Sequence, residues 1–135
     1  MRKPKVIVLD SWAIMAYLEG EPAAERVADL ISDAHDDAVP LLMSVVNAGE
    51  IWYIIARRTN PAEADRAIRM IREIGIDFVE ADWPLSKIAA SFKVKGNISF
   101  ADCFAAAVAK HNKATLLTGD HEFEQLKDEI SIVWL

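Results

Sequence analysis

A run of apolar, mostly β-branched residues near the start of the chain constrains the fold more than any other feature. Lys5-Val-Ile-Val-Leu-Asp10 is short and has no alternating polar positions, which is typical of a strand buried on both faces. Such strands occur in parallel sheets, where a helix on one face connects each strand to the next. Further strand and helix patterns alternate along the rest of the chain. We therefore predict an α/β fold, with a largely parallel β-sheet flanked by helices.

The predicted elements can be given as ranges. Strands are expected at 5–10, 39–43, 76–79, 114–118 and 130–135. Helices are expected at 11–19, 23–33, 44–58, 62–74, 85–95, 100–111 and 121–127. Ser44 and Ser99 are the predicted N-caps of two helices, because a serine hydroxyl accepts hydrogen bonds from free N–H groups of the first turn. In such a sheet, ligands bind beyond the carboxyl ends of the strands, where the strand order reverses.

Composition limits the classes of function. The chain has 135 residues, 53% of them hydrophobic, which suits one domain over residues 1–135 and argues against disorder. Its net charge of −6 argues against a protein that coats nucleic acid by bulk charge. The single cysteine, Cys103, excludes an intramolecular disulfide and a cysteine-based zinc cage. The apolar run after the basic opening at 1–5 is too short for a signal peptide or a membrane span, so we expect a cytoplasmic protein.

Four acidic residues are the candidates for chemistry, and each also has a structural interpretation. Asp10 lies at the end of the first strand and Asp120 at the end of the fourth, in Thr118-Gly-Asp120, so either residue can cap the helix after it. Asp102 lies three residues after Ser99, which is the spacing of a capping box. Glu50 lies on a helix among apolar residues, where a carboxylate needs a partner. No single acid decides between structure and function.

The joint placement of these acids favours a metal site. Asp10, Asp102 and Asp120 can all face the carboxyl edge of the sheet. If Glu50 faces that edge too, four carboxylates converge, and they repel one another unless a hard cation neutralises them. Oxygen ligands suit Mg²⁺ or Mn²⁺, whereas zinc would favour histidine or cysteine. The three histidines lack the spacing of a zinc motif, and we interpret them as surface or capping residues. His121, next to Asp120, is the one histidine to test as a neighbour of the site.

Four motifs, in order along the chain, resemble those of the PIN-domain nucleases. They are Val8-Leu-Asp10-Ser11, Asn47-x-x-Glu50, Ser99-Phe-Ala-Asp102-Cys-Phe-Ala-Ala-Ala and Leu117-Thr118-Gly-Asp120-x-x-Phe123. More closely, the chain resembles the VapC-type toxins of prokaryotic toxin–antitoxin pairs. The resemblance implies a homodimeric, metal-dependent endoribonuclease that cleaves RNA and is restrained by a cognate antitoxin. Its Mg²⁺ or Mn²⁺ would be held by Asp10, Glu50, Asp102 and Asp120.

Other residues near the motifs are given supporting roles. The resemblance implies that the hydroxyls of Ser11 and Thr118 hold water or a ligand carboxylate, and an ordinary turn hydroxyl is the alternative for Ser11. Asn47 lies one helical turn before Glu50 and is expected to orient that carboxylate. The family commonly carries a small hydroxyl residue where Trp12 stands. We expect Trp12 to pack in the core beneath the first helix, with base stacking as the alternative.

RNA binding requires positive charge around the acids. Without the four site carboxylates the net charge would be −2 in place of −6, which is compatible with a local basic rim. Arg57, Lys93 and Lys95 are the predicted RNA contacts. The rival hypothesis is a catalytically silent PIN-fold binding module, which is favoured if Glu50 or Asp102 points away from the other acids.

Overall fold

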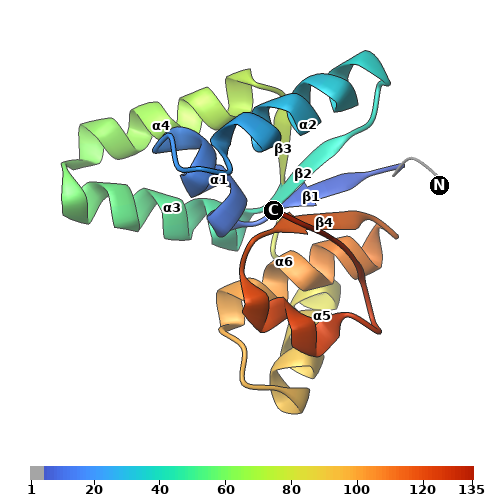
Figure 1. The fold of residues 1–135 in the computed structure, drawn as a ribbon. Coiled ribbons are helices and arrows are strands. Elements are labelled where there is room, and N and C mark those ends of the chain that lie inside the picture. The colour runs from blue at the N-terminus through green and yellow to red at the C-terminus, as the bar shows by residue number, and fades with distance from the viewer. Residues whose placement is uncertain (1–4) are drawn as a thin grey trace.

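Five parallel strands lie between two layers of helices in the computed structural model, which describes residues 5–135 (Figure 1). The strands are β1 (Ile7–Leu9), β2 (Leu41–Ser44), β3 (Ile76–Val79), β4 (Thr115–Thr118) and β5 (Ser131–Trp134). The helices are α1 (Ser11–Leu18), α2 (Ala24–Asp36), α3 (Val45–Arg58), α4 (Pro61–Glu73), α5 (Trp83–Lys95) and α6 (Phe100–His111), with a 3₁₀ helix, η1 (His121–Leu126). Each predicted element is present; of the basic opening, residues 1–4 lie outside the described part.

The strand order creates a natural binding edge. The sheet runs β3-β2-β1-β4-β5, and every neighbouring pair is parallel. From β1 the chain builds the sheet in one direction through β2 and β3, and it then returns to the other side of β1 with β4 and β5. The order therefore reverses between β1 and β4. The carboxyl ends of these two strands form the position where sheets of this kind bind ligands, so the predicted parallel α/β fold is confirmed.

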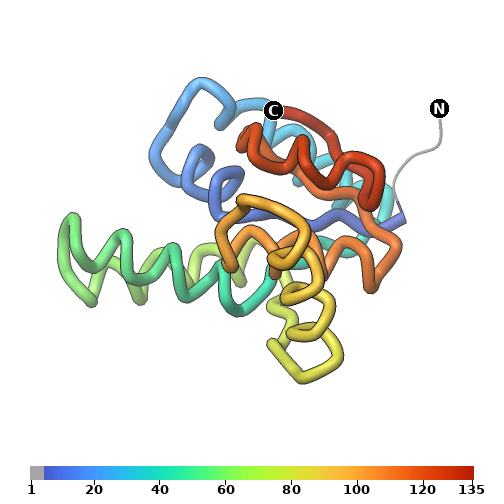
Figure 2. Tube along the Cα trace, turned by 90° about the horizontal axis from the view of Figure 1, so that it is seen from below, coloured from blue at the N-terminus to red at the C-terminus, as the bar shows by residue number. Residues whose placement is uncertain are grey.

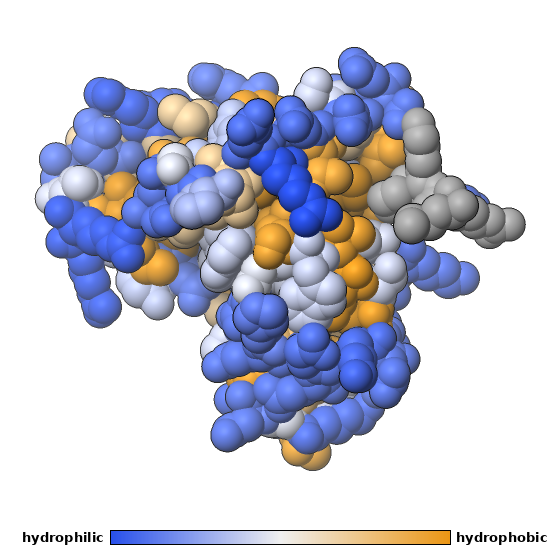
Figure 3. Space-filling view, viewed as in Figure 1, coloured by the Kyte–Doolittle hydropathy of each residue, from blue (hydrophilic) through white to orange (hydrophobic). Residues whose placement is uncertain are grey.

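Adjacent residues of the central strands face opposite layers. Val8 and Leu116 pack with α5, α6 and η1, whereas Leu9 and Leu117 pack with α1, α2 and α3. Alternation of this kind explains why these strands lack polar positions, since both faces are covered. Figure 2 shows α3 and α4 running side by side and projecting to one side of the molecule. In Figure 3, hydrophobic side chains gather over the strands in the middle of the view, and hydrophilic ones cover the helical ends.

Capping residues set the ends of the helices near the binding edge. The Ser44 hydroxyl accepts from the N–H of Val46, and the Ser99 hydroxyl accepts from the N–H of Asp102, so both predicted caps are confirmed. α4 begins at Pro61, before the predicted start, because Asn60 caps it and proline is favoured in a first turn. Between Lys5 and Leu135 no helix has the length and apolar character needed to cross a bilayer.

Candidate active site

Asp10 lies at the end of β1 and is almost completely buried, with 1% of its surface exposed. One carboxylate oxygen accepts from the N–H of Ala13 at 2.8 Å and so caps α1. The other accepts from the hydroxyl of Thr118, at the end of β4, at 2.5 Å. Asp10 is therefore both a helix cap and a bridge across the switch in strand order. The structural interpretation of Asp10 as a helix cap is confirmed, and its role as a metal ligand stays a prediction.

Asp102, Asp120 and Glu122 form the tightest group of acids in the described residues. One carboxylate oxygen from each lies within 4.8 Å of the other two. Asp102 is held at the start of α6, and Asp120 leads into η1, where its carboxylate accepts from the N–H of Glu122 at 3.0 Å. The structure thus adds Glu122 to the predicted acids. Its nearness to Asp120 in the sequence was the one signal for it, but only the 3₁₀ turn after β4 returns the side chain to the group.

Glu50 completes a hollow of about 390 Å³ around these acids. We call it the acid hollow; its lining residues are Ser11, Trp12, Met15, Glu50, Ile54, Ser99, Asp102, Asp120 and Glu122. Glu50 borders the hollow from α3 but lies outside the 4.8 Å group. Among the described residues that line the hollow, none is lysine or arginine. Four carboxylates therefore face one space without a protein cation beside them.

The electrostatics of the buried acids follow from this crowding. Burial raises the pKa of Asp10 from 3.8 to about 7, and the hydrogen bonds from Thr118 and Ala13 offset only part of that rise. Burial, with the charges of Asp120 and Asp10, raises the pKa of Asp102 to about 7 as well. Ionising both carboxyls is costly in the protein alone. A cation among oxygen ligands would remove that cost, so the donor set fits a hard divalent ion.

Asn47 has a different partner from the one predicted. Its amide nitrogen donates to the carbonyl of Ala101 at 3.1 Å, rather than to the carboxylate of Glu50, because the start of α6 packs against this part of α3. Within residues 5–135 its buried Oδ1 has no hydrogen-bond partner. The Ser11 hydroxyl donates to the backbone carbonyl of Asn47 at 3.4 Å, which supports the structural interpretation of Ser11. Asn47 thus ties α3 to the residue before Asp102.

The three predicted RNA contacts lie outside the acid hollow. Lys93 donates to the carbonyl of Ile98 at 2.7 Å, just before the Ser99 cap. Lys95 forms an ion pair with Glu129 at 2.7 Å. Arg57 lies over the ring of Tyr53, 5.2 Å from its centre. Their contribution to RNA binding stays a prediction.

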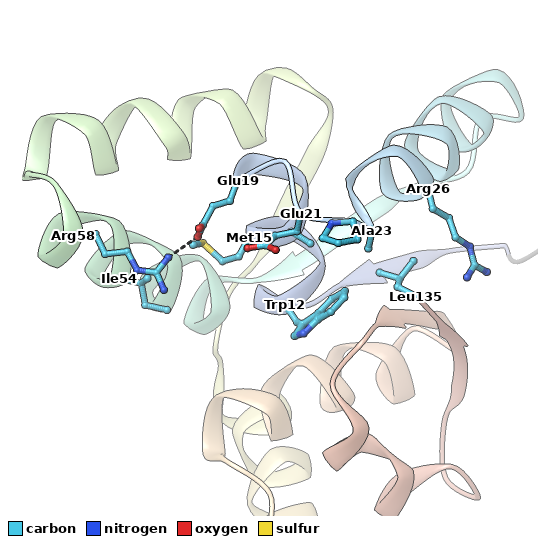
Figure 4. Close-up of a pocket in the computed structure, with 11 residues that line it drawn as sticks. Trp12, Met15, Glu19, Glu21, Ala23, Arg26, Ile54, Arg58 and Leu135 are labelled. Carbon is cyan, nitrogen blue, oxygen red and sulfur yellow. Dashed lines mark hydrogen bonds and ion pairs between the residues drawn. The ribbon is translucent and has the colours of Figure 1, made fainter.

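The expectation that Trp12 belongs to the core is wrong. It is 39% exposed, because it follows the buried Ser11 on the outer side of α1. Its ring borders both the acid hollow and a larger groove of about 700 Å³, and we call the latter the apolar groove. The groove is lined by Trp12, Met15, Ala16, Glu19, Glu21, Pro22, Ala23, Arg26, Ile54, Arg58 and Leu135 (Figure 4).

Two polar contacts fix the walls of the apolar groove. Glu19 and Arg58 form an ion pair at 2.6 Å between α1 and α3, drawn as the dashed contact in Figure 4. Arg26 on α2 donates to the backbone carbonyl of Trp134 at 2.7 Å and so holds the C-terminal strand. The groove is therefore bounded by elements from both ends of the chain.

The molecule is an α/β domain that groups carboxylates where the strand order reverses. The sequence profile of the PIN domain matches residues 7–129, and the chain belongs to that family. No curated protein has a sequence that matches this chain significantly.

Solved structures share the fold at low sequence identity. VapBC2 from Rickettsia felis, bound to a DNA fragment from its promoter, has a TM-score of 0.74 at 11% identity, over 95% of this chain and 97% of that chain. VapBC-1 from nontypeable Haemophilus influenzae has a TM-score of 0.72 at 19% identity, over 96% of this chain and 97% of that chain. Mycobacterium tuberculosis VapC20, described as a Sarcin-Ricin loop cleaving toxin, has a TM-score of 0.69 at 18% identity, over 87% of this chain and 92% of that chain. The predicted resemblance to VapC toxins is confirmed at the level of fold.

Proposed function

We propose that this protein is a divalent-metal-dependent endoribonuclease that hydrolyses RNA phosphodiester bonds. The observation that carries the proposal is the acid hollow. Glu50, Asp102, Asp120 and Glu122 line one space at the carboxyl edge of the sheet, and Asp10 lies buried at the same edge. This arrangement occurs in a chain of the PIN domain family. A structurally similar toxin, VapC20, is described as cleaving the Sarcin-Ricin loop, which supports RNA as the substrate class.

Mg²⁺ or Mn²⁺ is the cofactor that the donor set fits. Asp102, Asp120 and Glu122 would hold the ion, and Glu50 would contribute from α3. Asp10 does not line the hollow, but its charge acts on Asp102 from its buried position at the same edge. When bound, the ion would supply the Lewis acid that activates water and offsets the charge that develops on the phosphate.

The protein's own residues define the geometry of this site. The Thr118 hydroxyl donates to the Asp10 carboxylate and accepts from the N–H of Asp120 at 3.0 Å. It therefore fixes the positions of the two acids relative to each other. The Ser99 cap and the Asn47 bond to Ala101 fix the start of α6, which carries Asp102. Fixed ligands of this kind are needed because a site for phosphate hydrolysis must be organised before the substrate arrives.

A cognate antitoxin is the partner that we propose for the apolar groove. The groove is large and mostly apolar in its lining, and it adjoins the acid hollow through Trp12, Met15 and Ile54. Solved relatives in fold include VapBC assemblies from several bacteria. A toxin role in the cytoplasm, and a homodimer in solution, belong to this proposal.

The experiment compares wild type with Asp102→Asn on a mixed single-stranded RNA pool, with Mn²⁺ or with EDTA. Asparagine keeps the size of the side chain but removes a charge that the ion needs, so cleavage should fall by two orders of magnitude or more while the fold persists. Asp77→Asn removes the same charge from an exposed position on β3 and should cleave like wild type. Wild-type activity in Asp102→Asn would contradict the mechanism. An inactive wild type, with metal present, would favour the silent binding module.

A further inference from the structure

We propose that Trp12 is the stacking platform for the nucleobase beside the scissile phosphate. The inference rests on the proposed ribonuclease function and adds to it a residue that fixes the substrate.

The position of Trp12 supports this role. It is the second residue of α1, and it lines the acid hollow together with Asp102, Asp120 and Glu122. Its neighbours in the helix, Ser11 and Ala13, are buried, yet Trp12 is 39% exposed. A large aromatic side chain that stays partly open beside a set of carboxylates is available for a ligand.

Gly119 fixes the plane of the indole ring. A Cβ added to Gly119 would lie 2.3–2.5 Å from three carbons at the outer edge of the ring, Cη2, Cζ2 and Cζ3. Because these three distances are almost equal, the glycine backbone lies over the ring face at that edge. Gly119 lies between Thr118 and Asp120, so its contact with the ring fixes the position of the indole relative to these two residues of the site. A fixed plane is what a stacking surface requires.

The charge of the hollow favours a contact that does not depend on cations. Among its described lining residues there is no lysine or arginine, so no lining side chain offers a cation to the phosphates of an RNA in the hollow. The bound ion would offset one phosphate, whereas the flanking base needs an apolar surface. Every nucleobase has a π-face, and an aromatic ring binds it without depending on charge. The Trp12 ring is the aromatic surface that the hollow offers.

The size of the hollow favours RNA over a protein segment. Its volume of about 390 Å³ lies at the low end for ligand pockets. The apolar groove, at about 700 Å³, offers more room for a partner helix of about 10 Å diameter. A protein partner that reaches Trp12 from the groove is the competing explanation. The two differ in whether the loss of Trp12 changes RNA binding when no partner is present.

The test measures kcat and KM for wild type, Trp12→Leu, Trp12→Phe and Trp83→Leu. The substrate is a single-stranded RNA oligonucleotide, cleaved in Mn²⁺, whose cleavage position is mapped first. Trp12→Leu should raise KM about five- to hundredfold with a smaller change in kcat. Trp12→Phe should retain most of the affinity, because it keeps an aromatic face. Trp83 is 72% exposed at the start of α5 and does not line the hollow, so Trp83→Leu is the matched control and should behave like wild type.

A second substrate isolates the base contact. The same oligonucleotide with an abasic residue beside the scissile phosphate should weaken binding to wild type about as much as Trp12→Leu does. It should add almost nothing to the defect of Trp12→Leu, because the stacking partner is already gone. The contribution of Trp12 should also stay constant as salt rises, unlike that of phosphate contacts.

The outcomes separate this proposal from the function on which it rests. A wild-type KM in Trp12→Leu, or an abasic defect of equal size in wild type and Trp12→Leu, would overturn the stacking role and leave the ribonuclease intact. If wild type cleaves no RNA, the ribonuclease proposal fails. Anisotropy of the intact labelled oligonucleotide with wild type, Trp12→Leu and Trp12→Phe then decides the stacking role, since Trp12→Leu should bind more weakly and Trp12→Phe should bind like wild type.

Discussion

Thr118 donates from its hydroxyl to the carboxylate of Asp10 at 2.5 Å, across 108 residues of sequence. The bond joins the carboxyl ends of β1 and β4, the two strands between which the sheet changes direction. The same hydroxyl accepts from the N–H of Asp120. One buried oxygen therefore sets the positions of two acids that come from distant parts of the chain.

Thr118→Val should destabilise the protein by about 1–3 kcal/mol. Valine has nearly the same shape, but it leaves one oxygen of the buried Asp10 carboxylate without a donor, while the other keeps its bond from Ala13. It also leaves the Asp120 N–H without an acceptor. Urea denaturation of metal-free protein measures the change. Thr118→Ser should recover most of the loss, since it restores the hydroxyl. Thr115→Val on the same strand is the control, because Thr115 is only half-buried and its bond to Ser131 is long, at 3.4 Å; an equal loss there would rule out a special role for Thr118.

Asp10 should make the metal-free protein less stable as the pH rises from about 4 to about 7. The pKa of Asp10 is raised from 3.8 to about 7 in the folded state, so the folded protein keeps a proton that the unfolded chain releases. The contribution of protonated Asp10 to the free energy of unfolding is complete below about pH 4 and is lost as pH rises to about 7. A shift of one unit in a pKa corresponds to about 1.4 kcal/mol, so the free energy of unfolding lost over this range is on the order of a few kcal/mol.

Asp10→Asn is the comparison for this effect, because asparagine also caps helices but does not titrate. The free energy of unfolding of wild type minus that of the variant should decline between pH 4 and 7 and then level off. Saturating Mn²⁺ should reduce the decline, since the ion favours the ionised carboxylate. A difference that stays constant over this range in metal-free buffer would show that Asp10 titrates normally.

Glu122 should bind metal, although the four motifs did not single it out. Glu122→Gln removes one of three carboxylates that approach within 4.8 Å, so the Mn²⁺ affinity should fall by about tenfold or more. Calorimetric titration or the metal-induced rise in Tm gives the affinity. Glu124→Gln changes an exposed acid two residues further on, outside the group, and should bind Mn²⁺ like wild type. Equal affinities in the two variants would remove Glu122 from the site.

The sequence predicted the fold well because the signals of this chain are local. The β-branched runs, the Ser44 and Ser99 caps and the strand-ending acids each depend on a few neighbouring residues, and they placed Asp10 and Asp120 at the same edge. Strand ends and the capping box also placed Asp102 there. In a parallel sheet, the direction of the strands then brings such residues together without further information.

The remaining details depend on contacts between distant segments. Asn47 donates to Ala101 and not to Glu50, because helix packing between α3 and α6 decides which acceptor lies nearest. Trp12 is exposed because its position on α1 points it past the buried Ser11 and over Gly119. Glu122 joins the acids only through the 3₁₀ turn. None of these relations follows from spacing along one segment.

Gly119→Ala should displace Trp12. The added Cβ would lie 2.3 Å from the Cη2 atom of the ring, so the indole must move, and the free energy of unfolding should fall by about 1–3 kcal/mol. Gly49→Ala is the matched control: a Cβ there has no neighbour within 4 Å, and alanine is the better helix former, so α3 should gain up to about 1 kcal/mol. Urea denaturation of both variants, and of Trp12→Leu with and without Gly119→Ala, gives the coupling between the two residues. Gly119→Ala should cost much less in the Trp12→Leu background, since the ring that it strikes is absent. An equal cost in both backgrounds would mean that the glycine is needed for another reason and does not hold the ring.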